Sequence, residues 1–247
     1  MKKFENIQYA NEHERQVLDL YIPDKESFKT FIYIHGGGMD GGSKDLYVKV
    51  GEYLAENGYG AAVISYRLYP EAKYPDFIED SASAVAWVFE HIKEYGNCDK
   101  IYVGGSSAGG FMTQMMCFDK KWLGAHNLKP TDVAGFYHDA GQPTVHFNVL
   151  REMGIDSRRC IIDEKAPLYY IGLDEEYPPM RFNVSDNDIP ARLEQTHLIV
   201  ATLKHFGHTE NIEVREFHGS HCEYVNRVDE KGYPDEAKMM VEYLANA

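Results

Sequence analysis

Short apolar runs alternate with longer amphipathic segments along this chain. Seven apolar runs have the length of strands, at residues 17–22, 31–35, 61–66, 100–105, 133–138, 180–185 and 212–217. The clearest helical period lies in 80–92, where four apolar residues share one face, namely Ala82, Val85, Ala86 and Phe89. A further helix is predicted from Pro190 to just before Gly207, and another over 234–247.

Strands that alternate with helices predict an α/β fold, with a mostly parallel, doubly wound sheet and helices on both faces. The short connection between 17–22 and 31–35 predicts that these two strands form an antiparallel hairpin at one edge. We find no repeat and no linker, so residues 1–247 are expected to form a single domain. Residues 119–166 break the alternation, and their part at about 140–166 is predicted to be a small lid-like insertion over the ligand crevice of the sheet.

A glycine-rich loop follows the second predicted strand, in the sequence "HGGGMDGG" at 35–42. Gly36, Gly38 and Gly41 fit the G-x-G-x-x-G pattern that cradles a dinucleotide pyrophosphate. The same residues, read as His-Gly-Gly-Gly, fit the oxyanion loop of an ester hydrolase. Both interpretations place an anion against backbone N–H groups, so the loop alone does not separate them.

A second glycine motif, "GSSAG" at 105–109, lies between a predicted strand and a predicted helix. It fits the G-x-S-x-G pattern of a nucleophile elbow, in which the central serine, Ser107, sits on a tight turn. The positions two before and two after that serine must lack a bulky side chain. The helix that follows directs free N–H groups and its dipole towards a negative charge formed at the serine.

A serine nucleophile needs a histidine base and a carboxylate that orients the histidine. Candidate residues follow the last two predicted strands, with Asp186 and Asp188 after the first and His218 and His221 after the second. His221 is preferred because it lies a few residues into its loop. Asp186 is preferred because it is the first loop residue, whereas Asp188 is placed to cap the next helix.

These motifs together resemble the hormone-sensitive-lipase-like branch of the α/β-hydrolases and its small bacterial, acetyl-esterase-like members. The resemblance runs from about residue 17 to the C-terminus and rests on the two glycine motifs, on Tyr66-Arg67 and on the two later loops. Many lipase-like members carry a longer helical N-terminal cap, whereas 34 residues precede His35 here. We therefore expect residues 119–166 to determine which substrate is bound.

The resemblance implies an α/β-hydrolase fold with an oxyanion hole formed by the N–H groups of Gly37, Gly38 and Ala108. It implies a serine carboxylic ester hydrolase with Ser107, Asp186 and His221 as catalytic triad, acting on short acyl esters, including acetyl esters, of a small molecule or carbohydrate. An amidase or formamidase on the same triad, or a non-catalytic ligand-binding homologue, are the alternatives. The dinucleotide interpretation leaves the serine elbow and both later loops unexplained.

Composition argues against two classes of partner and is compatible with the small-molecule ester that the resemblance implies. A net charge of −14 argues against nucleic acid and against an anionic membrane surface. The chain shows no secretory signal and no apolar run that could span a membrane, and its four cysteines suggest free thiols in a reducing cytoplasm. No metal-binding motif is present, so no metal or cofactor is expected. The oligomeric state is left open, with a homodimer as one expectation.

Overall fold

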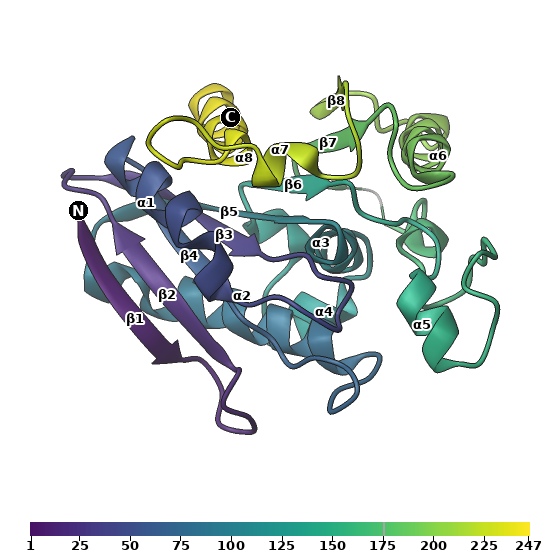
Figure 1. The fold of residues 1–247 in the computed structure, drawn as a ribbon, viewed down its shortest axis with the longest axis horizontal. Helices are drawn as coiled ribbons and strands as arrows, with labels where there is room; N and C mark the ends of the chain where they lie inside the picture. Colours follow the sequence, from purple (N-terminus) through teal and green to yellow (C-terminus); the bar gives the residue numbers. More distant parts are fainter. Residues whose placement is uncertain (175) are drawn as a thin grey trace.

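The computed structural model describes residues 1–174 and 176–247, and its centre is a single mixed β-sheet (Figure 1). The strands lie in the order β1-β2-β4-β3-β5-β6-β7-β8. Only the two pairings of β2, with β1 and with β4, are antiparallel, and the pairings from β4 to β8 are parallel. The strands are β1 (Lys2–Gln8), β2 (Val17–Ile22), β3 (Phe28–Ile34), β4 (Gly60–Ile64), β5 (Cys98–Ser106), β6 (Gly135–Asp139), β7 (Met180–Ser185) and β8 (Ile212–Phe217).

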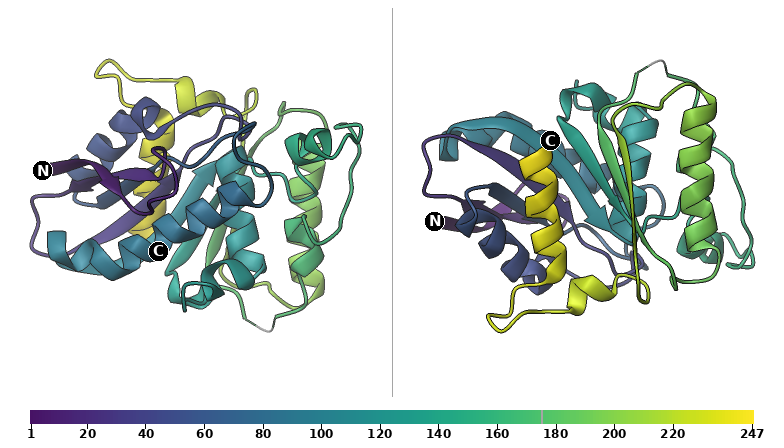
Figure 2. Two further views of the ribbon diagram at one scale, coloured as in Figure 1. Left: turned by 90° about the horizontal axis from the view of Figure 1, so that it is seen from below. Right: turned by 90° about the horizontal axis from the view of Figure 1, so that it is seen from above.

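Helices cover both faces of the sheet, and side-chain alternation along β3 assigns each helix to a face. Phe31 and Tyr33 pack with α1 (Val48–Glu56) and α8 (Asp235–Asn246). Ile32 and Ile34 point to the opposite face. There they join a larger core with residues of α2 (Asp76–Tyr95), α3 (Ala108–Phe118) and α6 (Arg192–His205). The two views of Figure 2 show helices on both sides of the sheet. Three shorter helices are α4 (Lys121–Gly124), α5 (Phe147–Glu152) and α7 (Glu223–Asn226).

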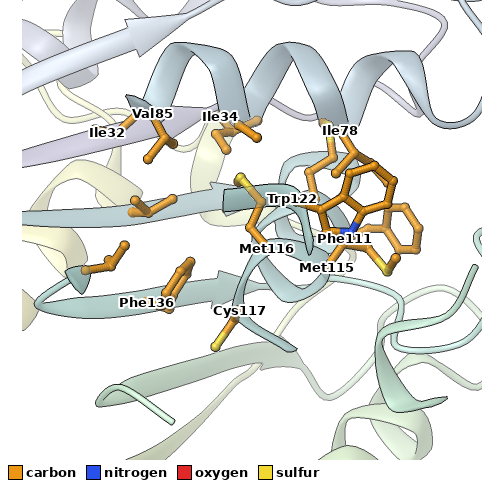
Figure 3. Close-up of a cluster of buried hydrophobic side chains, with 14 of the residues drawn as sticks. Ile32, Ile34, Ile78, Val85, Phe111, Met115, Met116, Cys117, Trp122 and Phe136 are labelled. Atoms are coloured by element: carbon orange, nitrogen blue, oxygen red, sulfur yellow. The ribbon is translucent and has the colours of Figure 1, made fainter. Parts of the chain in front are cut away.

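The larger core holds α3 against the middle of the sheet (Figure 3). Phe111 and Met116 of α3 and Ile34 of β3 are fully buried. Burial of each such side chain stabilises the fold by about 1.5–3 kcal/mol. Because α3 begins immediately after Ser107, this packing fixes the position of the predicted nucleophile.

The prediction of a hairpin between the first two predicted strands is wrong, because β4 lies between β2 and β3. The antiparallel edge is instead formed by β2 and a strand that the apolar pattern missed, β1. The sequence of β1, "KKFENIQ", is mostly exposed and polar, as is typical of an edge strand. The other predicted strands and helices are present, although the helix predicted from Pro190 begins at Arg192, because Ala191 adopts a left-handed conformation with φ of 66°.

The segment at 140–166 follows β6 and contains α5. Thr144 Oγ1 donates to Gln195 Oε1 of α6 at 3.3 Å, and the amide of Asn148 on α5 donates to the carbonyl of Gly38 in the glycine-rich loop. The segment therefore reaches from α6 to that loop, while its role as a lid stays a prediction. In the described residues, every helix is too short or too polar to cross a lipid bilayer.

Candidate active site

The turn from β5 into α3 holds Ser107 in a strained backbone conformation. Its φ is 56° and its ψ is −111°, values that a residue with a side chain rarely adopts and that cost about 1–3 kcal/mol. The two flanking glycines allow this geometry. A Cβ at Gly105 would lie 2.5 Å, and one at Gly109 2.0 Å, from the carbonyl oxygen of Ile34 on the adjacent strand. Both positions therefore exclude a bulky side chain, as predicted for the elbow.

The glycine-rich loop after β3 passes directly beside this turn. A Cβ on Gly36 would lie 3.3 Å from the Cβ of Ser107. Gly37 and Gly38 have φ values of 106° and 65°, which turn their N–H groups away from a regular strand direction. Among the hydrogen bonds of residues 1–174 and 176–247, none uses the N–H of Gly37, Gly38 or Ala108 as donor. Three backbone donors are thus free near Ser107.

His35 holds this loop through a hydrogen bond to its backbone. Its Nδ1 lies 2.6 Å from the carbonyl oxygen of Gly36, so an Nδ1–H donates to that oxygen. The ring is buried and stacks on Tyr66 at 4.3 Å between centroids. Burial lowers the pKa of His35 to about 4, with only partial compensation from the Gly36 carbonyl. His35 is therefore neutral at pH 7 and acts on the loop by hydrogen bonding.

The imidazole of His221 lies between a hydroxyl and a carboxylate. Its Nε2 is 2.8 Å from Ser107 Oγ, and its Nδ1 is 2.5 Å from Asp188 Oδ1. Asp188 has only 1% of its side chain exposed and His221 has 24%. A neutral His221 with a proton on Nδ1 donates to Asp188 and presents Nε2 as acceptor to the Ser107 hydroxyl.

The structure corrects the prediction for Asp186, which does not contact His221. Its Oδ2 lies 2.8 Å from Nδ1 of His218, whose side chain is 96% exposed. The reason is that Asp186 still continues the sheet, since its N–H donates to the carbonyl of Phe217 at the end of β8. The chain turns towards Ser107 only after this residue, which carries Asp188 inward.

The alternative role of Asp188 as a helix cap is also not found. The N-cap position of α6 is Ala191, and Oδ1 of Asp188 instead accepts the N–H of Ile189 at 2.7 Å and binds His221. The two aspartates after β7 and the two histidines after β8 form two pairs, Asp186 with His218 and Asp188 with His221. The residues of each pair are separated by nearly the same length of sequence. Only the depth of each pair in the fold distinguishes them.

Two side chains near the site were not found from the sequence. Asn148 of α5 donates its amide to the Gly38 carbonyl and so holds the glycine-rich loop at a second point, two residues after the Gly36 carbonyl that His35 binds. Arg192, at the start of α6, is buried and donates to Ala140 O and to Gln142 Oε1. Burial lowers its pKa, and the negative charge of Asp188 opposes that change. Neither Asn148 nor Arg192 belongs to a recognisable motif, so no sequence signal indicates either role.

No group of three or more histidine, cysteine, aspartate or glutamate side chains in the described parts of the chain is arranged to hold a metal ion.

The model for the BD-FAE family matches residues 18–150, which is more than half of the chain. The chain belongs to the BD-FAE family. This matched stretch contains the glycine-rich loop and Ser107, whereas Asp188 and His221 lie beyond it.

Relatives of this BD-FAE family member are esterases by name. A probable isoprenylcysteine alpha-carbonyl methylesterase ICMEL1 of Oryza sativa subsp. japonica is 38% identical over 101 residues, which cover 40% of this chain and 24% of the relative. The acetyl esterase of Salmonella paratyphi B is 36% identical over 95 residues, covering 38% of this chain and 29% of the enzyme. The matched stretch therefore spans less than a third of either relative.

Solved structures share the fold over nearly the whole chain. Esterase B from Lactobacillus rhamnosis superposes with a TM-score of 0.78 at 18% identity, covering 99% of this chain and 84% of that one. Esterase 2 of Thermogutta terrifontis gives 0.77 at 21% identity, covering 98% and 94%. A bifunctional GH43-CE protein of Bacteroides eggerthii gives 0.76 at 20% identity, covering 99% and 35%. The fold is that of the α/β-hydrolases, as the sequence predicts.

Proposed function

We propose that this protein is a serine carboxylic ester hydrolase that acts on short acyl esters, including acetyl esters, of a small molecule or carbohydrate. The observation that carries the proposal is the hydrogen-bonded series of Ser107 Oγ, His221 and Asp188, with distances of 2.8 and 2.5 Å. A hydroxyl, an imidazole and a buried carboxylate in this order form the arrangement that generates a serine nucleophile.

In the acylation step, Ser107 Oγ attacks the carbonyl carbon of the ester while its proton passes to Nε2 of His221. Asp188 holds the imidazole in the required tautomer and stabilises the imidazolium. The carbonyl electron pair moves onto oxygen, where the N–H groups of Gly37, Gly38 and Ala108 donate. Each donor of this kind contributes about 3 kcal/mol to stabilisation of the transition state.

The tetrahedral intermediate collapses when the bond to the alcohol oxygen breaks and His221 returns its proton to that oxygen. A water molecule then attacks the acyl-serine, with His221 again taking the proton, and releases the carboxylic acid and free Ser107. This cycle needs neither a metal nor a cofactor. The Asn148 contact to Gly38 and the His35 contact to Gly36 support it by fixing the loop that carries two of the three donors.

The proposed chemistry is supported by relatives whose names state it. An acetyl esterase shares 36% identity over 95 residues, and the T. terrifontis esterase has been solved with propionate and butyrate bound, which are short acyl products. Esterase B has been solved inhibited by a tributyrin phosphonate. A truncated carbohydrate esterase from gut microbiota also shares the fold, with a TM-score of 0.73.

The direct test is hydrolysis of p-nitrophenyl esters from acetyl to decanoyl by the wild type and by Ser107→Ala. We expect the highest kcat/KM for acetyl or butyryl, and a loss of about 10⁵-fold or more in Ser107→Ala, because the nucleophile is absent. Ser83→Ala is the matched control, since Ser83 is a serine on α2 whose hydroxyl bonds only within its helix and to His126.

A set of p-nitroanilides and acetylated sugars extends the test to amides and to carbohydrate esters. Equal rates for wild type and Ser107→Ala would refute the proposal. Turnover of amides alone would replace the esterase by an amidase on the same residues.

A further inference from the structure

Two buried carboxyl groups lie beneath the active site and take no part in the mechanism above. Asp139 is at the C-terminal end of β6, and Glu236 is in the first turn of α8. Both side chains belong to residues with 0% of their surface exposed. A buried carboxylate normally has a salt bridge, and neither residue has a lysine or arginine partner among the ion pairs of the described residues.

Glu236 contacts the end of β5, the strand that leads into the nucleophile. The hydroxyl of Ser106, the residue before Ser107, lies in short contact with Glu236 Oε1. The hydroxyl of Tyr33 lies 3.0 Å from Glu236 Oε2 and 3.3 Å from Ser106 Oγ. Two hydroxyls therefore hold the carboxyl group of Glu236 beside the residue that precedes the nucleophile.

Asp139 contacts the site through the backbone of Ser107 and through residues next to His221. The N–H of Ser107 donates to the backbone carbonyl of Asp139 at 2.8 Å, and the hydroxyl of Tyr224 donates to its Oδ1. Its Oδ2 lies 3.8 Å from Sγ of Cys222. That sulfur in turn lies 3.7 Å from Nε2 and 3.9 Å from Nδ1 of His221. One side chain, Cys222, thus separates the Asp139 carboxyl from the imidazole.

The two carboxyl groups cannot both ionise easily in this environment. Burial raises the pKa of Asp139 to about 6, opposed by the Tyr224 and Ser106 hydroxyls and by the charge on His221. Burial and then the charge on Asp139 raise the pKa of Glu236 to about 8. The two charges repel each other, so we expect the pair to share one proton near pH 7, and the proximity of His221 favours the negative charge on Asp139.

We propose that Asp139 is a positioning residue for the reaction, whose carboxylate supplies a second negative charge behind His221, across the Cys222 side chain. This inference rests on the proposed function. When His221 becomes an imidazolium, Asp188 stabilises it through a hydrogen bond and Asp139 stabilises it through space, across Cys222. Asp139 also supports the elbow directly, because its backbone carbonyl binds the N–H of Ser107.

Polar and titratable groups surround the pair from several elements. They are Tyr33 from β3, Tyr47 before α1, Ser106 from β5, Tyr137 from β6, Asp188 after β7, His221, Cys222 and Tyr224 around α7, and Arg192 from α6. The tyrosine and cysteine groups are neutral at pH 7, since burial raises the pKa of each. These tyrosines and Cys222 therefore do not titrate between about pH 5 and 8, where the ionisation of Asp139 and Glu236 changes.

A purely structural role for Asp139 predicts a different result from a positioning role. A buried charge without a salt bridge costs free energy, so its replacement by a neutral group of the same shape removes that cost. Asp139→Asn is therefore expected to keep or increase thermal stability. If Asp139 acts on His221, the same variant must lose activity, so stability and activity move in opposite directions.

The first experiment measures kcat and KM of wild type and Asp139→Asn from pH 5 to 9, with butyryl ester as substrate. We expect a kcat about 10-fold lower at pH 7, a KM within about twofold, and an acid limb displaced by about half a pH unit to lower pH, because a nearby negative charge has been removed. Asp19→Asn is the matched control: Asp19 is a buried carboxylate on β2 paired with Lys44, on a different strand from the site. The acid limb of the Asp19→Asn profile should coincide with that of the wild type.

A second variant, Tyr224→Phe, keeps the Asp139 carboxyl and removes a hydroxyl that stabilises its ionised form. It should resemble Asp139→Asn at pH 6 and approach the wild type at pH 8, where the carboxyl ionises again. An unchanged acid limb in folded Asp139→Asn, or an equal displacement in Asp19→Asn, would overturn the proposal. The proposal would also be overturned if the kcat of Tyr224→Phe differed from that of the wild type by the same factor at every pH. This second test remains valid even if Asp139→Asn does not fold.

The imidazole titration of His221, followed by NMR in substrate-free protein, separates this proposal from the proposed function. A lower titration midpoint in Asp139→Asn or Tyr224→Phe supports the electrostatic contact even if no ester is hydrolysed. An unchanged midpoint in an active esterase refutes the role of Asp139 and leaves the proposed function intact.

Discussion

Two aspartate–histidine pairs lie at the end of β7 and β8, and they differ mainly in depth. The Asp188–His221 pair is buried on its carboxylate side and reaches Ser107, whereas the Asp186–His218 pair faces solvent. The charges of Asp186 and His218 act on each other, which lowers the pKa of Asp186 and raises that of His218. Solvent screens an exposed pair of this kind, so we expect it to contribute little to stability or to chemistry.

Substitution of each aspartate by asparagine tests this assignment with a matched pair of variants. Asp188→Asn should reduce kcat by about 10⁴-fold, because the amide favours the wrong tautomer of His221. Asp186→Asn should stay within about twofold of the wild type. Steady-state hydrolysis of a butyryl ester checks both, and the reverse order of effects would restore Asp186 as the orienting residue.

The sequence could identify Ser107 and His221 because each stands in a motif or position with a physical requirement. Ser107 needs small residues on both sides, and the printed sequence supplies them at Gly105 and Gly109. It could not select between Asp186 and Asp188, because that choice depends on one backbone hydrogen bond, from the N–H of Asp186 to Phe217. A long-range hydrogen bond of this kind leaves no local pattern.

At the scale of elements, the site depends on the contact between β3 and β5. These strands pair in parallel from Lys29 with Lys100 to Ile34 with Gly105. The register brings the loop after β3 and the turn after β5 to the same sheet edge, which is where parallel α/β sheets bind ligands. Close approach at this edge needs glycines at several positions, among them Gly109.

Gly109→Ala should disrupt this contact. Its Cβ would lie 2.0 Å from the carbonyl oxygen of Ile34, so strand and helix must separate. We expect a loss of about 1–3 kcal/mol in the free energy of unfolding, together with a large fall in kcat. Gly124→Ala on α4 is the control, because no atom lies within 4 Å of its added Cβ. Chemical denaturation and the ester assay measure the two effects, and equal stability of both variants would contradict the steric argument.

The elements themselves were predictable where the hydrophobic pattern is strong. The buried parallel strands contain apolar runs, such as FIYI in β3 and AAVI in β4, because helices cover both faces of the sheet. The polar strand β1 carries no such signal, since one side of it is open to solvent. The order of strands was not predictable at the edge, because a short connection between 17–22 and 31–35 suits a hairpin as well as a crossover that leaves room for β4.

For the whole molecule, buried titratable groups set the dependence of stability on pH. Burial lowers the pKa of His35 to about 4 and of His138 to about 3. Below about pH 6.5 the unfolded chain binds protons that these folded histidines do not bind, so stability falls as the pH decreases. Glu236 acts in the opposite sense, since it keeps its proton in the folded state up to about pH 8. The unfolded glutamate releases its proton near pH 4.3, so between these values its contribution to stability falls as the pH rises.

We therefore expect the melting temperature to be highest near pH 6–7 and to decrease on both sides. Glu236→Gln should abolish most of the decrease between pH 7 and 8, because the amide does not titrate. Glu242→Gln, a change at a solvent-exposed position of the same helix, should leave the decrease in place. Thermal unfolding at pH 5, 6.5 and 8 measures this, and an alkaline decrease that persists in Glu236→Gln would contradict the assignment.

The position of the site also constrains how the chain folds. The oxyanion loop, Ser107, Asp188 and His221 come from the ends of four strands, β3, β5, β7 and β8, and Glu236 adds the last helix. Contacts between residues so distant in sequence form slowly, because long loops must close first. Recovery of the proposed esterase activity during refolding should therefore lag behind recovery of helical content, because the four strand ends meet only when the sheet is fully assembled.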